Sequence, residues 1–173
     1  MQDIIVPPLN KDAAEIVHKN WQAVDEVPYQ LGKVEKMVEK YAAICGTPDF
    51  EGKIKSAMLL MCGDHGIAKY GVSAYPQEVT MQMINGYMRG TAGANVMARH
   101  AGADVFVVDM GTTFDLSHLP KVRNEKVAWG TEDFTQGPAM SRAEAVQAVG
   151  EGIALARELA EETFAPLSVL LIE

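Results

Sequence analysis

The chain has 173 residues, of which 48% are hydrophobic, so it can bury one substantial core, and collagen, coiled-coil arrays and disordered tails are excluded. Its 23 acidic and 15 basic residues give a formal net charge of −8, and without a basic run it offers no groove to a nucleic acid. No apolar run approaches the roughly 18 residues that span a bilayer, and the start lacks the order of a signal peptide, so we expect a cytoplasmic protein without a membrane partner.

A helical pattern covers the first part of the chain. Apolar side chains recur at three-to-four-residue spacing over 11–26 and again over 31–44, which predicts two amphipathic helices. Pro28 ends the first of them, and a loop rich in glycine and proline follows the second. We therefore predict an N-terminal helical segment at 1–52, part of a small domain, and an incomplete second domain at 53–173.

Short continuous apolar runs indicate strands in the second domain. Such runs are typical of strands buried on both faces, and they lie at 57–62, 104–109 and 167–172. Helical stretches separate them at 76–88, 93–101 and 141–163. Strands that alternate with helices predict an α/β fold, a parallel Rossmann-like sheet with helices on both faces. The charged segment 121–129 is a candidate for a further strand at the sheet edge.

Two of the predicted helices carry additional features. Ser141 and Glu144 form the S-x-x-E pattern of a capping box, which marks the start of the long last helix, and we assign that helix packing and no chemistry. The helix at 76–88 has apolar residues on two faces, so we expect it to be buried on most sides. Its methionines suit either a core or the wall of a site for a flat apolar ligand, and periodicity does not separate the two.

Polar residues follow two of the predicted strands. Asp64 and His65 stand in G-D-H-G after the first strand, and Asp109 begins D-M-G-T-T at the end of the second. Ligands of open parallel sheets bind at this carboxyl edge, where these three residues are candidates to bond sugar hydroxyls or to transfer protons. The alternative for the aspartates is that they only fix loops, and the alternative for His65 is a structural histidine.

A glycine-rich segment precedes the helix at 93–101. Arg89 and Gly90 begin the run R-G-T-A-G, an arrangement that binds phosphate through free N–H groups, and close helix packing is the alternative that we favour. The four histidines are scattered, so no metal site is predicted, and the sequence has no nucleophile motif. Cys45 and Cys62 do not form a C-x-x-C pair, and we expect both to be buried free thiols.

Five motifs in order carry a resemblance to a known family. They read M-C-G-D-H-G-I at 61–67, G-V-S-A-Y-P-Q-E-V-T at 71–80, R-G-T-A-G at 89–93, A-G-A-D-V-F-V-V-D at 101–109 and G-P-A-M-S-R at 137–142. The stretch 55–173 resembles the nicotinate-nucleotide–dimethylbenzimidazole phosphoribosyltransferases, and 28–35 resembles them only in part. The resemblance implies an enzyme, a pentosyltransferase that moves phosphoribose from nicotinate mononucleotide to a lower-ligand base and gives the α-ribotide in cobamide (vitamin B12) biosynthesis.

The same resemblance implies which residues bind the base. Tyr75, Pro76 and Met83 match positions of the base pocket, and the aromatic ring and thioether suggest an altered base preference that includes phenolic bases. Glu173 is a candidate for a family glutamate that follows a strand, while the main base-activating glutamate lies in the C-terminal half of the family. The pyridinium leaving group is already cationic, so the resemblance implies neither a metal nor another cofactor.

The length of the chain differs from that of the family it resembles. Family members are much longer than 173 residues. We therefore expect a truncated or naturally split N-terminal portion that is inactive alone and that forms a homodimer or pairs with the missing C-terminal half. The alternative is a non-catalytic small-molecule-binding or regulatory module that needs a partner chain. A small metal-dependent hydrolase that uses Asp64, His65 and Asp109 is the third hypothesis.

Overall fold

The structure is a computed structural model that describes residues 5–24, 31–49, 55–162 and 168–172. The chain divides into two compact units, Gln2–Lys53 and Ile54–Glu173. Among the described residues, no helix combines the length and the apolar character needed to pass through a lipid bilayer.

The first unit is a pair of helices. They are α1 (Lys11–Val24) and α2 (Lys33–Cys45). Each helix turns an apolar stripe toward the other, so Ala13 and Val17 pack with Ala42 in a small core to which Trp21 and Val38 are added. The two predicted helices are confirmed, and Pro28, which was expected to end the first, lies outside the described residues.

The second unit is built on a parallel sheet of four described strands. They are β1 (Ser56–Gly63), β2 (Ala103–Gly111), β3 (Val122–Asn124) and β4 (Ser168–Ile172). Their spatial order is β3-β2-β1-β4, which places β1 and β2 in the middle. Leu59 of β1 pairs with Phe106 on one side and with Leu171 on the other, and every pairing is parallel. The predicted α/β class with a parallel sheet is confirmed.

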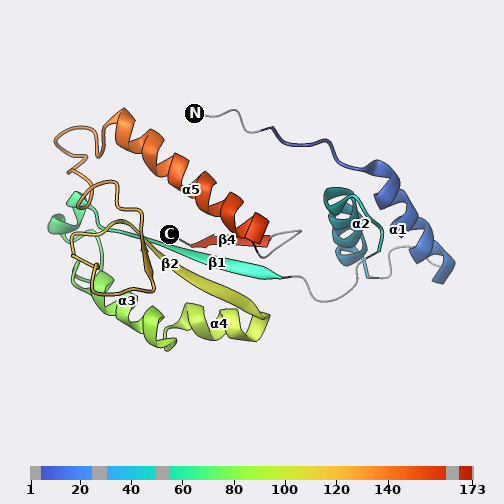
Figure 1. The fold of residues 1–173 in the computed structure, drawn as a ribbon, viewed down its shortest axis with the longest axis horizontal. Coiled ribbons are helices and arrows are strands. Elements are labelled where there is room, and N and C mark those ends of the chain that lie inside the picture. The colour runs from blue at the N-terminus through green and yellow to red at the C-terminus, as the bar shows by residue number, and fades with distance from the viewer. Residues whose placement is uncertain (1–4, 25–30, 50–54, 163–167, 173) are drawn as a thin grey trace. The chain divides into compact units, whose positions relative to one another are not determined.

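Helices cover both faces of this sheet (Figure 1). They are α3 (Val79–Arg89), α4 (Gly93–Ala101) and α5 (Arg142–Glu162). Because successive strand residues point to opposite faces, β1 serves two cores at once. Leu59 packs with Leu155 and Leu159 of α5, whereas Met58 and Leu60 pack with Ile84 of α3 and Ala98 of α4. This double burial explains why the strand sequence is a continuous apolar run.

The burial of α3 differs from the sequence-based expectation. Among the helix residues only Ile84 is fully buried, and Met83 is 40% exposed. The helix packs against one face of the sheet, and Met81, Tyr87 and Met88 are only partly buried against the core around Ile84. The helix also begins at Val79, three residues later than predicted. The expectation that it is buried on most sides is therefore wrong.

The segment 121–129 is a strand only at its start. β3 covers three residues at the sheet edge, as the charge of the segment predicted. Beyond it the chain remains tied to β2 through the N–H of Val127, which donates to the Met110 carbonyl at 3.0 Å. This tether brings the side chain of Lys126 against the end of β2.

Candidate functional site

Two cavities flank the carboxyl end of β1. The α3 cavity, of about 890 Å³ including the part open to solvent, is lined by the end of β1, the loop that follows it and α3. The α5 cavity, of about 640 Å³, is lined by the ends of β1 and β2, the loop 127–140 and the start of α5. Gly63, Asp64 and His65 border both cavities and form their shared wall.

The carboxylate of Asp64 holds the shared wall together. The side chain is 3% exposed. Its Oδ1 accepts the Thr80 hydroxyl of α3 at 2.7 Å, and its Oδ2 accepts the Thr113 N–H at 2.8 Å and the Thr113 hydroxyl at 2.9 Å. Asp64 thus joins α3 to the loop after β2. The geometry favours the loop-fixing alternative over a proton-transfer role, because three donors already occupy the carboxylate.

The carboxylate of Asp109 is held by hydrogen bonds at one oxygen and by an ion pair at the other. It is fully buried, its Oδ1 accepts the Thr112 N–H at 2.8 Å, and its Oδ2 forms an ion pair with Lys126 Nζ at 2.9 Å. Lys126 also donates to the carbonyls of Thr112 and Phe114 and lies 4.2 Å from the ring centroid of Trp129. Neither aspartate has an arrangement suited to a metal ligand or a general base. No group of three potential metal-ligating side chains lies together in the part of the chain that the structure describes.

His65 is the exposed side chain of the shared wall. Its Nδ1 lies 3.4 Å from the Thr131 hydroxyl, and its backbone forms a parallel bridge with Thr131. Because the ring borders both cavities, it is the titratable side chain of this wall that a ligand can reach.

All three side chains that the resemblance places in a base pocket line the α3 cavity. Tyr75 and Pro76 lie at its exposed rim, with Tyr75 72% exposed, and Met83 forms part of the α3 wall. Cys62 and Tyr87 also line it; the sequence pattern places Tyr87 on the same apolar helix face as Met83 and gives Cys62 no place in a site. The ring of Tyr75 does not fill the cavity, so pocket volume gives no support to an altered base preference.

Two groups of the α3 cavity have raised pKa values. Burial and, to a smaller extent, the negative charges of Asp109 and Asp64 together raise the pKa of the Cys62 thiol to about 12. Burial also raises the pKa of Tyr87, with a smaller effect from Cys62. At neutral pH both groups are uncharged, so they suit a neutral flat ligand better than an ion. Cys45 and Cys62 are free as predicted, but both are half-buried rather than buried.

We expect the Cys62 thiol to resist alkylation in the folded protein. A thiol pKa of about 12 leaves so little thiolate at pH 8 that iodoacetamide should modify Cys62 at least about 100-fold more slowly than an unperturbed cysteine. Mass spectrometry of peptides after timed labelling measures the rate, and the protein unfolded in urea is the control in which the difference must disappear. Labelling of native Cys62 at the unfolded rate would contradict the raised pKa.

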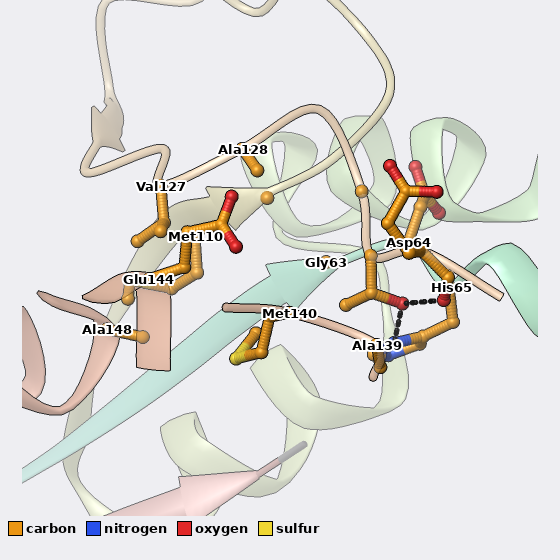
Figure 2. A pocket seen from close by; sticks show the side chains of 14 residues that line it. Gly63, Asp64, His65, Met110, Val127, Ala128, Ala139, Met140, Glu144 and Ala148 are labelled. Carbon is orange, nitrogen blue, oxygen red and sulfur yellow. Dashed lines mark hydrogen bonds between the residues drawn. The ribbon is translucent and has the colours of Figure 1, made fainter. Parts of the chain in front are cut away.

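The α5 cavity is lined by apolar side chains and by three carboxylate residues, Asp64, Glu132 and Glu144. Figure 2 shows Met110, Glu144 and Ala148 on one side and Asp64 and His65 on the other. Ser141 and Glu144 form the predicted capping box, with the Ser141 N–H donating to Glu144 Oε2 at 2.6 Å. This backbone hydrogen bond is the largest of the effects that lower the pKa of Glu144, so its carboxylate is ionised at neutral pH. The sequence pattern assigns this helix packing alone, yet Glu144 and Ala148 near its start line a cavity.

The remaining candidates lie apart from the two cavities. Gly90 ends α3 with φ 72°, and its carbonyl accepts Arg99 Nη1 at 2.7 Å, so this glycine is needed as a helix cap. Neither Arg89 nor Gly90 lines the α3 or the α5 cavity. Glu173 lies outside the described residues.

Comparisons with known proteins identify the family. A family model described as "Phosphoribosyltransferase" matches residues 6–169. The nicotinate-nucleotide–dimethylbenzimidazole phosphoribosyltransferase of Geotalea uraniireducens is 47% identical over 139 residues, which cover 79% of this chain and 39% of that protein. Its counterpart from Chloroflexus aggregans is 42% identical over 153 residues, which cover 88% of this chain and 43% of that protein.

Solved structures give the same result. The crystal structure of the phosphoribosyltransferase of that name from Thermus thermophilus superimposes with a TM-score of 0.85 at 32% identity, covering 95% of this chain and 49% of that one. The chain thus spans less than half the length of these relatives. The match of the family model over residues 6–169 nevertheless includes most of both units and both cavities. The chain therefore belongs to the nicotinate-nucleotide–dimethylbenzimidazole phosphoribosyltransferase family.

Proposed function

We propose that the chain takes part in the transfer of phosphoribose from nicotinate mononucleotide to a benzimidazole-type base, and that the α3 cavity binds the base. The observation that carries the proposal is the convergence of Tyr75, Pro76 and Met83 on one cavity beside the carboxyl end of β1. That edge of a parallel sheet is where ligands of such folds bind. The names of the relatives supply the reaction class and the kind of base.

The chemistry of the cavity suits the acceptor base. Its apolar walls and protonated Cys62 and Tyr87 fit a flat neutral heterocycle, and the thioether of Met83 packs well on an aromatic ring. The transferred group leaves a pyridinium nitrogen, which departs as neutral nicotinate nitrogen without protonation. The incoming base must lose a proton as its nitrogen bonds to the anomeric carbon, so a proton acceptor is required.

No carboxylate that is free to accept this proton lies among the described residues of the α3 cavity lining. Asp64 is the one carboxylate among the described residues that line it, and its oxygens already accept three hydrogen bonds. The resemblance assigns base activation to a glutamate in the part of the relatives that this chain does not span. We therefore propose that this chain binds the base and that completion of the reaction needs residues beyond those described.

Binding of the base is measurable without turnover. We expect dimethylbenzimidazole to bind the chain in a calorimetric titration, and benzimidazole, adenine and p-cresol to be ranked by competition. Met83→Glu should weaken binding at least about tenfold, because a charge enters an apolar wall. Met97→Glu, at a 70% exposed position of α4, is the matched control and should bind as the unchanged chain does. Equal affinities for the two variants would contradict the assignment of the α3 cavity.

A second candidate is a binding module without catalysis. The observation that favours it is that the chain spans less than half of its relatives while both cavities are formed by its own residues. Release of nicotinate from nicotinate mononucleotide, measured with this chain alone and after addition of the remaining part of a relative, separates the two candidates. Base binding without turnover in both mixtures would favour the module.

We also propose that the chain acts in the cytoplasm and that it associates with a second copy or with a chain that carries the rest of the family fold. Two free cysteines suit a reducing compartment. Val34, Met37 and Ile44 of the helical unit are more than half exposed, which supports association through that unit in the complete assembly.

A further inference from the structure

Asp133 forms a buried anchor that no sequence motif indicated. Its side chain is 8% exposed, accepts three hydrogen bonds and forms one ion pair. Oδ1 accepts the N–H and the hydroxyl of Thr135 at 2.9 and 2.7 Å. Oδ2 accepts the Tyr70 hydroxyl at 2.8 Å and forms an ion pair with the Lys69 ammonium at 2.9 Å. A single carboxylate thus ties together two segments that are 63 residues apart in the sequence.

The contacts of Asp133 connect a short helix to the loop that precedes α5. Lys69 and Tyr70 end the 3₁₀ helix η1 (Gly66–Tyr70), and Thr135 belongs to the loop. At the other end of η1 the Gly66 N–H donates to the Thr131 carbonyl at 3.0 Å. A Cβ at Gly66 would lie 2.7 to 2.8 Å from backbone atoms of residues 131–133, so the two segments are in direct contact.

The loop that contains Thr131 and Asp133 also contacts the shared wall of the two cavities. The Thr131 N–H donates to the Asp64 carbonyl at 2.9 Å, and its hydroxyl faces His65 Nδ1. Thr131 and Glu132 line the α5 cavity, and His65 borders both cavities. Asp133 itself lines neither of them, so it affects a ligand only through these neighbours.

We propose that Asp133 is a positioning residue that fixes the His65 ring and the wall between the two cavities in the orientation that a ligand meets. The charge of the carboxylate is essential to this role, because all four partners are donors and an amide in its place would present a donor to some of them. Of these four contacts, the hydrogen bonds from Tyr70 and Thr135 contribute most, since the Lys69 side chain is 57% exposed and surface ion pairs contribute little. Hydrogen bonds from Thr135, Lys69 and Tyr70 lower the Asp133 pKa well below its usual range, so the carboxylate is ionised at every pH at which the protein is handled.

The test compares Asp133→Asn with Asp115→Asn in the full chain. Asp115 is a matched control, because it is an exposed carboxylate that accepts the Ser117 N–H at 2.9 Å and lines neither cavity. The first measurement is the long-range ¹H–¹⁵N spectrum of the histidine rings, with His65 assigned through His65→Gln. We expect Asp133→Asn to shift the His65 ring signals toward those of the unfolded chain while circular dichroism stays native, and Asp115→Asn to leave them unchanged. Unchanged His65 signals in folded Asp133→Asn would overturn the proposal.

The second measurement rests on the proposed function. The dissociation constant for dimethylbenzimidazole should rise about tenfold in Asp133→Asn, because displacement of the shared wall removes one favourable contact with the base. It should stay constant in Asp115→Asn. If the unchanged chain does not bind the base, the proposed function fails, and the His65 spectrum alone decides the role of Asp133. If Asp133→Asn does not fold, Tyr70→Phe decides it, since loss of one donor should shift the same His65 signals in the same direction. Identical His65 signals in folded Tyr70→Phe would then overturn the proposal.

Discussion

Replacing Lys126 with methionine is expected to lower the free energy of unfolding by about 3–5 kcal/mol, because it leaves the buried Asp109 carboxylate without its cation. The Asp109 side chain is 1% exposed and that of Lys126 is 12% exposed, so water cannot replace the lost partner. Lys126 also supplies a hydrogen to the Phe114 carbonyl at 3.0 Å, which fixes the loop after β2. Methionine keeps most of the side-chain volume, so the loss measures the charge and its hydrogen bonds.

Urea unfolding followed by circular dichroism measures this loss. Lys121→Met, at an exposed position before β3, is the matched control and should change stability by no more than about 0.5 kcal/mol. The double variant Asp109→Asn with Lys126→Met should recover part of the loss, because no unpaired charge remains buried. A Lys126→Met protein as stable as the control would show that the ion pair does not hold this edge of the sheet.

Asp64→Ala should cost about 2–4 kcal/mol, because it removes the acceptor of three hydrogen bonds at a site that is 3% exposed. The Thr113 N–H and the Thr80 hydroxyl would lose their partner. Asp64→Asn should cost less than alanine, since one side-chain oxygen can still accept from Thr80 or Thr113. Both variants should weaken base binding, because Asp64 joins α3 to the wall between the cavities.

The same unfolding experiment separates a structural Asp64 from a catalytic one. A catalytic carboxylate is often held in an environment that is unfavourable for its charge. Its removal then leaves the free energy of unfolding unchanged or raises it. Asp104→Ala, at an exposed position of β2, serves as the control and should stay within about 0.5 kcal/mol of the unchanged chain. An Asp64→Ala protein as stable as this control would show that the loops do not depend on the carboxylate.

The sequence was most informative where a single local pattern decides the structure. The runs in β1 and β2 are continuously apolar because both faces of the sheet are covered, and few other structures produce short runs of this kind. The start of α5 followed from Ser141 and Glu144, whose side chains cap the helix by contacts within one turn. Such features depend on near neighbours in the chain and were therefore predictable.

Burial and long-range contacts were less predictable. The two apolar faces of α3 suggested a buried helix, but Met83 faces a cavity, and periodicity cannot tell a cavity wall from a core. Lys126 and Asp133 were missed because their partners come from other elements, and a single charged residue in a loop carries no pattern. The distance of 63 residues between Asp133 and Tyr70 places that anchor beyond any local rule.

The candidate site shows the same division. The carboxyl edge and the residues Asp64, His65 and Asp109 followed from the position of the strands, whereas the roles of the two aspartates as loop anchors required the three-dimensional structure. Tyr75 and Met83 were singled out by the resemblance to a family and not by their own pattern. Their common place on the α3 cavity agrees with that resemblance without testing binding.

Methionine methyl resonances test the assignment of the base to the α3 cavity most directly, because each cavity is lined by two methionines. Met61 and Met83 line the α3 cavity, and Met110 and Met140 line the α5 cavity. In a titration of ¹³C-methyl-methionine-labelled chain with dimethylbenzimidazole, ring currents should shift the signals of Met61 and Met83 saturably and leave those of Met110, Met140 and the remote Met97 in place. Saturable shifts confined to Met110 and Met140, or no shift at any methionine, would contradict the assignment.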